Sequence, residues 1–165
     1  MLERIHYRHS NNFWGKRFED FKVGDTFTTD GRTVTEADIV IFSGLVGDFY
    51  SMHTDEELAK ETIYRTRVLQ GLLTFAISEG LILRGGFFDS IEEAQFVDVH
   101  DLRFTGAVKP GDTVKVKVEI TDKKDSNRPG YGIITLRRTV TNQRGETVLT
   151  AETSGMKKTA KQEAL

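Results

Sequence analysis

Residues 71–84, Gly71-Leu72-Leu73-Thr74-Phe75-Ala76-Ile77-Ser78-Glu79-Gly80-Leu81-Ile82-Leu83-Arg84, form a strongly apolar segment of this chain. In a helix, apolar side chains would occupy nearly every side of it, and only Thr74 and Ser78, one turn apart, would form a polar stripe. A helix that is apolar all round must be buried. Gly85-Gly86 then ends it. We therefore expect one buried central helix.

The chain after this helix predicts long antiparallel strands. Apolar and charged residues alternate from Val114 to Ile120, which is typical of a strand with one buried face. Residues 133–141 and 147–156 continue the pattern across a turn at residues 142–145, and residues 122–130 form a polar hairpin tip. A further strand alternates at Val97, Val99, Leu102 and Phe104, with a slip of one residue that indicates a β-bulge.

Shorter elements are predicted before the apolar helix. Residues 26–29 and 32–35 are expected to form two strands joined by a hairpin turn at Asp30-Gly31. A sheet of this length closes most economically by wrapping around the apolar helix. The predicted fold class is therefore α+β, with a curved antiparallel sheet around one long central helix.

Two capping signals frame a loop in the same region. Thr35-Glu36-Ala37-Asp38 has the form of a capping box and predicts a helix from about residue 36 to residue 46. Thr54-Asp55-Glu56-Glu57 repeats the signal and predicts a short helix. The intervening residues 47–53 are expected to form a tight loop.

Composition excludes several classes of protein. The 165 residues suit one domain, and a formal charge of −2 gives no basic field for nucleic acid. The absence of cysteine excludes disulfides and thiolate metal sites and fits a reducing cytosol. No secretory signal is found in the first 18 residues, and no apolar stretch is long enough to span a membrane. We expect a cytoplasmic protein without a metal or cofactor.

One pair of residues stands out as a candidate for catalysis. Of the four histidines, only His53 lies in a short loop between two capped helices and close to an acid, Asp48. Histidine titrates near neutral pH and a carboxylate can orient it, so such a pair could hold and deprotonate a water molecule. Spacing alone, however, is more typical of ordinary polar loop residues.

The surrounding sequence reads Phe42-Ser43-Gly44-Leu45-Val46-Gly47-Asp48-Phe49-Tyr50-Ser51-Met52-His53-Thr54-Asp55-Glu56. It resembles the signature loop of the MaoC-like dehydratase family, which includes (R)-specific enoyl-CoA hydratases. The family's pattern is Gly-Asp-x-Asn-Pro-apolar-His. Four residues match it: Gly47, Asp48, Met52 and His53. A second segment reads Arg67-Val68-Leu69-Gln70-Gly71-Leu72-Leu73-Thr74, and it resembles the stretch that leads into the central helix in this family. With the segments 21–25 and 109–112, the resemblance covers about residues 18–158.

The resemblance implies a hot-dog fold, a homodimer or higher homo-oligomer, and an acyl-CoA substrate in a tunnel at the subunit interface. The implied reaction is the reversible addition of water to a trans-2-enoyl thioester, giving a 3-hydroxyacyl thioester. Asp48 and His53 would share the water, one accepting its proton and the other supplying a proton to the α-carbon. The backbone N–H of Gly71 would stabilise the thioester oxygen. Gly71 is equally explained by close packing at the start of a helix.

Three departures from the family's pattern keep other functions open. Tyr50 replaces the Asn, Ser51 the Pro, and Gln70 the His that usually precedes Gly71. The alternatives are a hot-dog acyl-CoA thioesterase and a non-catalytic acyl-thioester-binding protein. The expected organisation is an N-terminal arm at residues 1–17, a single domain at residues 18–158 and a tail at residues 159–165.

Overall fold

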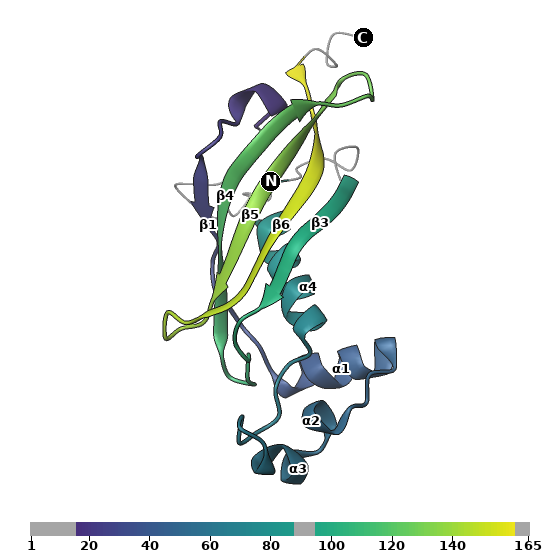
Figure 1. The fold of residues 1–165 in the computed structure, drawn as a ribbon, viewed down its shortest axis with the longest axis vertical. Coiled ribbons are helices and arrows are strands. Elements are labelled where there is room, and N and C mark those ends of the chain that lie inside the picture. Colours follow the sequence, from purple (N-terminus) through teal and green to yellow (C-terminus); the bar gives the residue numbers. More distant parts are fainter. Residues whose placement is uncertain (1–15, 88–94, 161–165) are drawn as a thin grey trace, which may run out of the picture.

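The computed structural model of the protein describes residues 16–87 and 95–160. Four long antiparallel strands dominate it (Figure 1): β3 (Gln95–Phe104), β4 (Thr113–Asp125), β5 (Tyr131–Thr141) and β6 (Thr147–Lys158). The strand order is β1-β4-β5-β6-β3, with β1 (Thr26–Thr28) and β3 at the edges. The expected tip between β4 and β5 is shorter than predicted, because β4 continues through Lys123 and Lys124 to Asp125 in register with β5.

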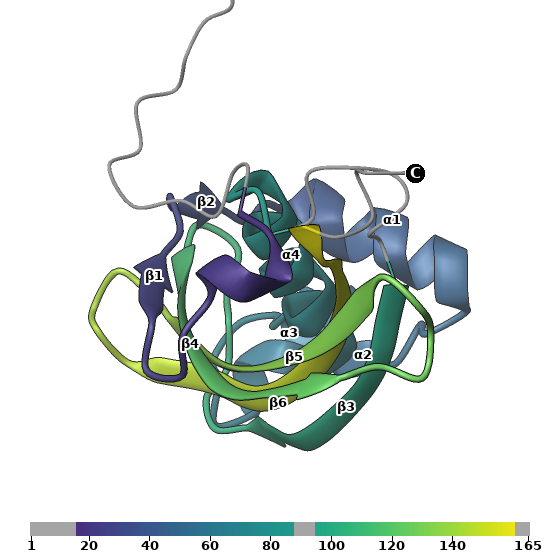
Figure 2. The same ribbon diagram turned by 90° about the horizontal axis from the view of Figure 1, so that it is seen from above.

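The predicted β-bulge is present in β3. Its register against β6 shifts between His100 and Arg103, where Asp101 has a positive φ of 47°, and shifts again between Phe96 and Asp98. An extra residue in one strand bends that strand and increases its twist. These irregularities fit the curvature of the sheet at this edge, which Figure 2 shows.

The prediction of a hairpin at Asp30-Gly31 is wrong. Strands β1 and β2 (Arg32–Thr33) do not pair with each other, and each pairs with β4. Between them, the Thr29 N–H donates to the carbonyl of Val116 at 2.9 Å, and the Thr29 hydroxyl accepts from the N–H of Val116 at 3.0 Å. Because Thr29 satisfies both polar groups of Val116, the chain continues along β4 instead of turning back.

The sheet curves around α4 (Gly71–Arg84), as Figure 2 shows. One face of α4 packs on alternate residues of β4, as the pattern predicts; the buried side chains are Leu73, Ile77, Leu81 and Ile82 of α4 and Val114, Val116, Val118 and Ile120 of β4. Burial of α4 is incomplete, however, since Leu72 is 61% exposed and Leu83 39%. Among residues 16–87 and 95–160, the sheet covers one side of the helix and leaves part of its apolar surface exposed.

Helix α1 (Glu36–Val46) has the predicted bounds. Its capping box forms as expected, with the Thr35 N–H donating to the Asp38 carboxylate at 2.8 Å. Gly47 ends the helix with a φ of 78°, a conformation that glycine adopts without steric cost.

The segment expected to be a loop contains a turn of helix. Helix α2 (Ser51–Thr54) includes His53, and α3 (Glu56–Glu61) follows directly. The capping residue of α3 is Asp55, whose carboxylate accepts from the N–H of Leu58 at 3.0 Å. Thr54 does not cap it; its hydroxyl donates to the carbonyl of Phe49 at 3.1 Å. His53 therefore lies on a helical turn fixed at both ends.

A buried arginine joins α4 to the sheet. Arg138 of β5 is 1% exposed, and its guanidinium donates to the Glu79 carboxylate at 2.6 Å, to Thr153 at 2.8 Å and to Ser78 at 3.0 Å. The guanidinium carbon also lies 4.7 Å from the centroid of the Phe75 ring. Ser78, one of the two polar residues predicted on the apolar helix, therefore has a partner in the sheet, the buried guanidinium of Arg138.

The ends of the chain are described only in part. The predicted arm is described at Lys16 and Arg17 and the predicted tail at Thr159 and Ala160; residues 1–15 and 161–165 lie outside the described residues. Within residues 16–87 and 95–160, no helix is both long enough and apolar enough to cross a membrane.

Candidate active site

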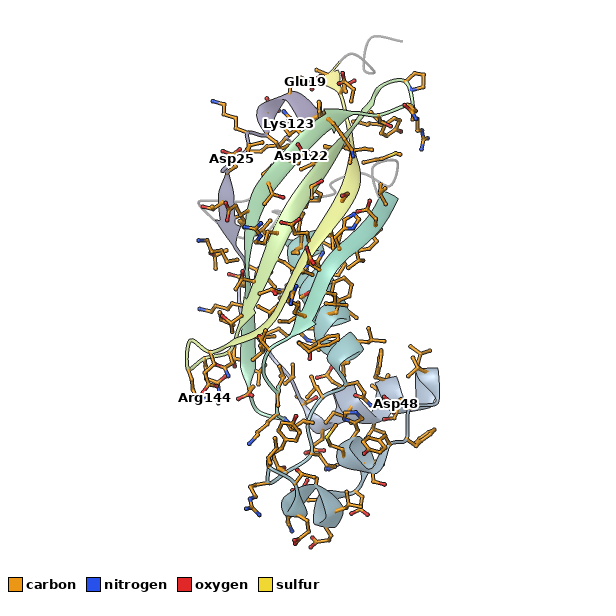
Figure 3. The ribbon with its side chains drawn as sticks, viewed as in Figure 1. Glu19, Asp25, Asp48, Asp122, Lys123 and Arg144 are labelled. Atoms are coloured by element: carbon orange, nitrogen blue, oxygen red, sulfur yellow. The ribbon has the colours of Figure 1, made fainter. Side chains whose placement is uncertain are left out.

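Asp48 follows Gly47, the C-terminal capping residue of α1 (Figure 3). The N–H of Gly47 donates to the carbonyl of Ser43 at 2.8 Å, which closes the helix and sets the direction of the next residue. The Asp48 carboxylate accepts from the N–H of Tyr50 at 3.3 Å. Its side chain is 41% exposed, so one part is held by the turn while another faces outward.

His53 is buried, and one of its ring nitrogens has a fixed role. Nδ1 lies 2.7 Å from the carbonyl oxygen of Val68. Since a carbonyl oxygen can only accept, Nδ1 carries the hydrogen, and in the neutral ring Nε2 keeps its lone pair. The ring of Tyr50 meets the imidazole edge-on, with centroids 6.2 Å apart.

The structure brings Asp48 and His53 together. His53 Nε2 lies 4.0 Å from Asp48 Oδ2. This separation is too long for a direct hydrogen bond, and a gap of this kind between two polar atoms can be bridged by a water molecule. Both facing atoms are acceptors when His53 is neutral and Asp48 is ionised, so a bridging water would donate one hydrogen to each.

Gly71 is the first residue of α4, where helix N–H groups have no acceptor within the helix. The first bond within this turn runs from the N–H of Thr74 to the carbonyl of Gln70. A Cβ at position 71 would lie 2.9 Å from the ring of Phe104, so a side chain here would require that ring to move. The close-packing interpretation is thus supported, and it is compatible with a donor role for the Gly71 N–H.

Two contacts around the candidate site were not predicted from the sequence. Gln70 is 2% exposed, and its side-chain nitrogen donates to the hydroxyl of Ser43 at 2.9 Å. In the sequence, Gln70 stands out only as a departure from the family's pattern, and its partner lies 27 residues earlier in the chain. Pairings over such separations have no signal in a single sequence.

The second unpredicted contact is made by Arg67. It pairs with Glu56 of α3 at 3.1 Å and also with Glu36 of α1. The backbone N–H of Arg67, the hydroxyl of Thr66 and the guanidinium all donate to Glu56 and lower the pKa of its carboxyl group. These bonds hold α1 and α3 against the chain leading into α4.

A cavity of about 460 Å³ lies between α1 and α4. Most of its lining is apolar: Ile41, Phe42 and Leu45 of α1, with Leu73, Ala76, Ile77, Gly80 and Leu81 of α4. Arg84 and the paired Arg32 and Asp38 also line it. Such a lining suits an apolar ligand group. No cluster of three or more metal-ligating side chains occurs among residues 16–87 and 95–160.

Comparison with known proteins identifies the family of this chain. The MaoC like domain model matches residues 20–142. An (R)-specific enoyl-CoA hydratase from Rhodospirillum rubrum is 30% identical over 146 residues, which cover 84% of this chain and 90% of the relative. Protein MaoC from Klebsiella aerogenes is 39% identical over 103 residues, and this match covers 62% of the chain but only 30% of that protein's length.

Solved structures agree on the architecture. A MaoC-like dehydratase from Rhodospirillum rubrum superposes with a TM-score of 0.78 at 27% identity, covering 88% of this chain and 98% of that one. The Mycobacterium tuberculosis protein RV0216, described as a double hot-dog fold, superposes with a TM-score of 0.74 at 21% identity, covering 88% of this chain and 45% of that one. The curved sheet around α4, the paired Asp48 and His53, and these matches together show that the chain has the hot-dog fold and belongs to the MaoC-like dehydratase family.

Proposed function

We propose that this protein is a hydro-lyase that adds water reversibly to a trans-2-enoyl-CoA or a related acyl thioester, giving a 3-hydroxyacyl thioester. The observation that carries the proposal is the 4.0 Å gap between His53 Nε2 and Asp48 Oδ2, with the tautomer of His53 set by Val68. Relatives named (R)-specific enoyl-CoA hydratase and 3-hydroxybutyryl-CoA dehydratase support the same class of reaction.

In the proposed reaction, a water molecule lies between Asp48 and His53. Its oxygen bonds to the β-carbon of the enoyl thioester while His53 Nε2 accepts one of its protons. The Asp48 carboxylate stabilises the imidazolium that forms, because opposite charges about 4 Å apart attract. The proton then passes from His53 Nε2 to the α-carbon. One water is thereby added across the double bond, and no other reactant is consumed.

Negative charge develops on the thioester oxygen during this addition. The N–H of Gly71, at the positive end of the α4 dipole, is the proposed donor to that oxygen. The apolar cavity is lined by Leu73, two residues further along the same helix, and would accept an acyl group. In this proposal, the acid–base pair after α1 and on α2, the backbone donor at the start of α4 and the cavity between α1 and α4 serve one substrate.

The test is a panel of enoyl-CoA thioesters of different chain length. Hydration removes the conjugated enoyl absorption without releasing a thiol. Release of free coenzyme A from these thioesters would replace the proposed function with thioester hydrolysis. Binding of the thioesters with neither hydration nor hydrolysis would show that the protein is a non-catalytic acyl-thioester-binding protein.

We also propose that the protein works as a homodimer or a multiple of it. Strand β3 is an edge of the sheet and exposes Phe96, Val97 and Val99 by 47%, 42% and 38%. Edge strands with exposed apolar side chains are sites of strand pairing, and large apolar patches mark interfaces. A second copy would also cover the exposed side of α4. Sedimentation equilibrium should show at least two chains; a monomer that is fully active would contradict this proposal.

A further inference from the structure

Residues 68–71 contact both elements that carry the candidate acid and base. The carbonyl of Val68 accepts from His53 Nδ1 at 2.7 Å, and the side chain of Gln70 donates to the Ser43 hydroxyl at 2.9 Å. Between them, the N–H of Leu69 donates to the carbonyl of Val108 at 2.8 Å, on the chain leading into β4. The segment is therefore bonded to the chain before β4, to α2 and to α1, and it ends at the first residue of α4.

Ser43 connects this segment to Asp48. Its hydroxyl meets Gln70, and its carbonyl accepts the N–H of Gly47, the residue before Asp48. Ser43 is 1% exposed and Gln70 2%, so water does not compete for their hydrogen bond. A serine hydroxyl can donate or accept, and the bond therefore forms whichever end of the amide faces it.

The buried amide of Gln70 is only partly hydrogen-bonded, so packing alone does not explain a glutamine at this position. Its Oε1 is buried and has no hydrogen-bond partner among the described residues. A buried polar atom without a partner lowers stability, and an apolar side chain of similar shape would avoid that cost. Burial of the Gln70 amide is therefore costly even though its nitrogen bonds to Ser43, which favours a role in the site.

We propose that Gln70 is a positioning residue. Through Ser43, it fixes the turn that carries Asp48 against the first turn of α4. The water between Asp48 and His53 and the N–H of Gly71 then face one thioester group in a constant geometry. The inference rests on the proposed hydratase function. The role of Gln70 in the reaction is indirect, because Gln70 acts through Ser43.

The kinetic test compares Gln70→Met and Ser43→Ala with the wild type on the best enoyl-CoA. A displacement of about 1 Å in a reacting group can cost about 100-fold in rate, so we expect kcat to fall about 10-fold to 100-fold. KM should change by less than about 3-fold, because the thioester contacts remain. The double variant should lose little more than the worse single variant, since both changes break one bond.

Two further variants separate positioning from general loss of packing. Thr74→Val removes another buried hydroxyl of α4, whose one partner among the described residues is the backbone carbonyl of Gln70 at 3.4 Å, and it should keep the wild-type kcat. Gln70→His retains a ring N–H that can donate to Ser43, and it should recover most of the kcat lost in Gln70→Met. Equal losses in Thr74→Val and Gln70→Met would overturn the proposal, as would a wild-type kcat in Ser43→Ala.

Hydrogen exchange tests the same inference without a substrate. In Gln70→Met, or in Ser43→Ala if the former does not fold, amides of residues 47–54 should exchange at least about 10-fold faster than in the wild type and in Thr74→Val. Unchanged exchange would overturn the positioning role. If the wild type hydrates no enoyl thioester, the proposed function fails, and hydrogen exchange alone decides whether Gln70 holds the turn.

Discussion

The strongest prediction concerns His53 and Asp48, changed separately and together. His53→Ala removes both the Nδ1–H bond to Val68 and the base at Nε2. Asp48→Asn keeps the shape of the side chain and removes the charge that lies 4.0 Å from Nε2. The two variants therefore delete different parts of one proposed proton-transfer unit.

The geometry sets the size of each loss. Removal of a general base costs about 10²-fold to 10⁴-fold in rate, which we expect for His53→Ala. Two unit charges 4 Å apart attract by about 1 kcal/mol in water and about 4 kcal/mol at an effective dielectric of about 20. The Asp48 side chain is 41% exposed, so its effect should lie between these limits. Since 1.36 kcal/mol corresponds to a factor of ten in rate, Asp48→Asn should lose about 5-fold to 10³-fold.

The assay is the initial rate of enoyl-CoA hydration, followed by the loss of conjugated absorption. Because both residues act on one water, the double variant should lose little beyond His53→Ala. His53→Ala also leaves the carbonyl of Val68 without its donor, so each variant is assayed well below its own melting temperature.

The matched control is the second histidine–aspartate pair in the described residues. His100 Nε2 lies 3.2 Å from Asp98 on the exposed side of β3, closer than His53 lies to Asp48. His100→Ala should retain the wild-type rate when sedimentation shows the same oligomer as the wild type, because β3 is also the proposed edge of the dimer. Wild-type rates in both Asp48→Asn and His53→Ala would refute the proposed pair, and additive losses would refute a shared water.

Further predictions concern α4 and the sheet. Gly71→Pro should lose about 10²-fold to 10³-fold more turnover than Gly71→Ala, since both add a Cβ against Phe104 and only proline lacks the N–H; equal activity would remove Gly71 from the mechanism. Glu79→Gln should lower the free energy of unfolding by about 3 kcal/mol or more in urea titrations, because it leaves the buried Arg138 without its counter-charge. Burial raises the pKa of Asp112, but hydrogen bonds from Arg144, the Lys109 N–H and Gln143 outweigh it and hold that pKa below its usual value. The stability that Asp112 contributes is therefore present above its unfolded pKa of about 3.9 and lost as the pH falls through the lower folded value, and Asp112→Asn should flatten this part of the melting temperature against pH.

Local sequence determined the elements whose signals lie within a few residues. The capping box at Thr35 and Asp38 and the glycine at position 47 gave the bounds of α1, because a helix end is set by its own first and last turns. Alternation along β4 gave its buried face for a similar reason, since side chains of a strand alternate between the two faces. The apolar segment 71–84 and the long strands after it were enough to predict a curved sheet around one helix.

Only the tertiary structure decided contacts between distant residues. The signals at Asp30-Gly31 indicated a hairpin, but pairing with β4, more than 80 residues away, prevailed because Thr29 bonds to Val116. Asp48 and His53 could be named from the sequence, whereas their 4.0 Å gap depends on a helical turn at α2 and on the carbonyl of Val68. The bond between Ser43 and Gln70 and the charge of Arg138 beneath α4 had no local signal. Each joins residues that only the folded chain brings together, and a single sequence records the types of such residues but not their pairing.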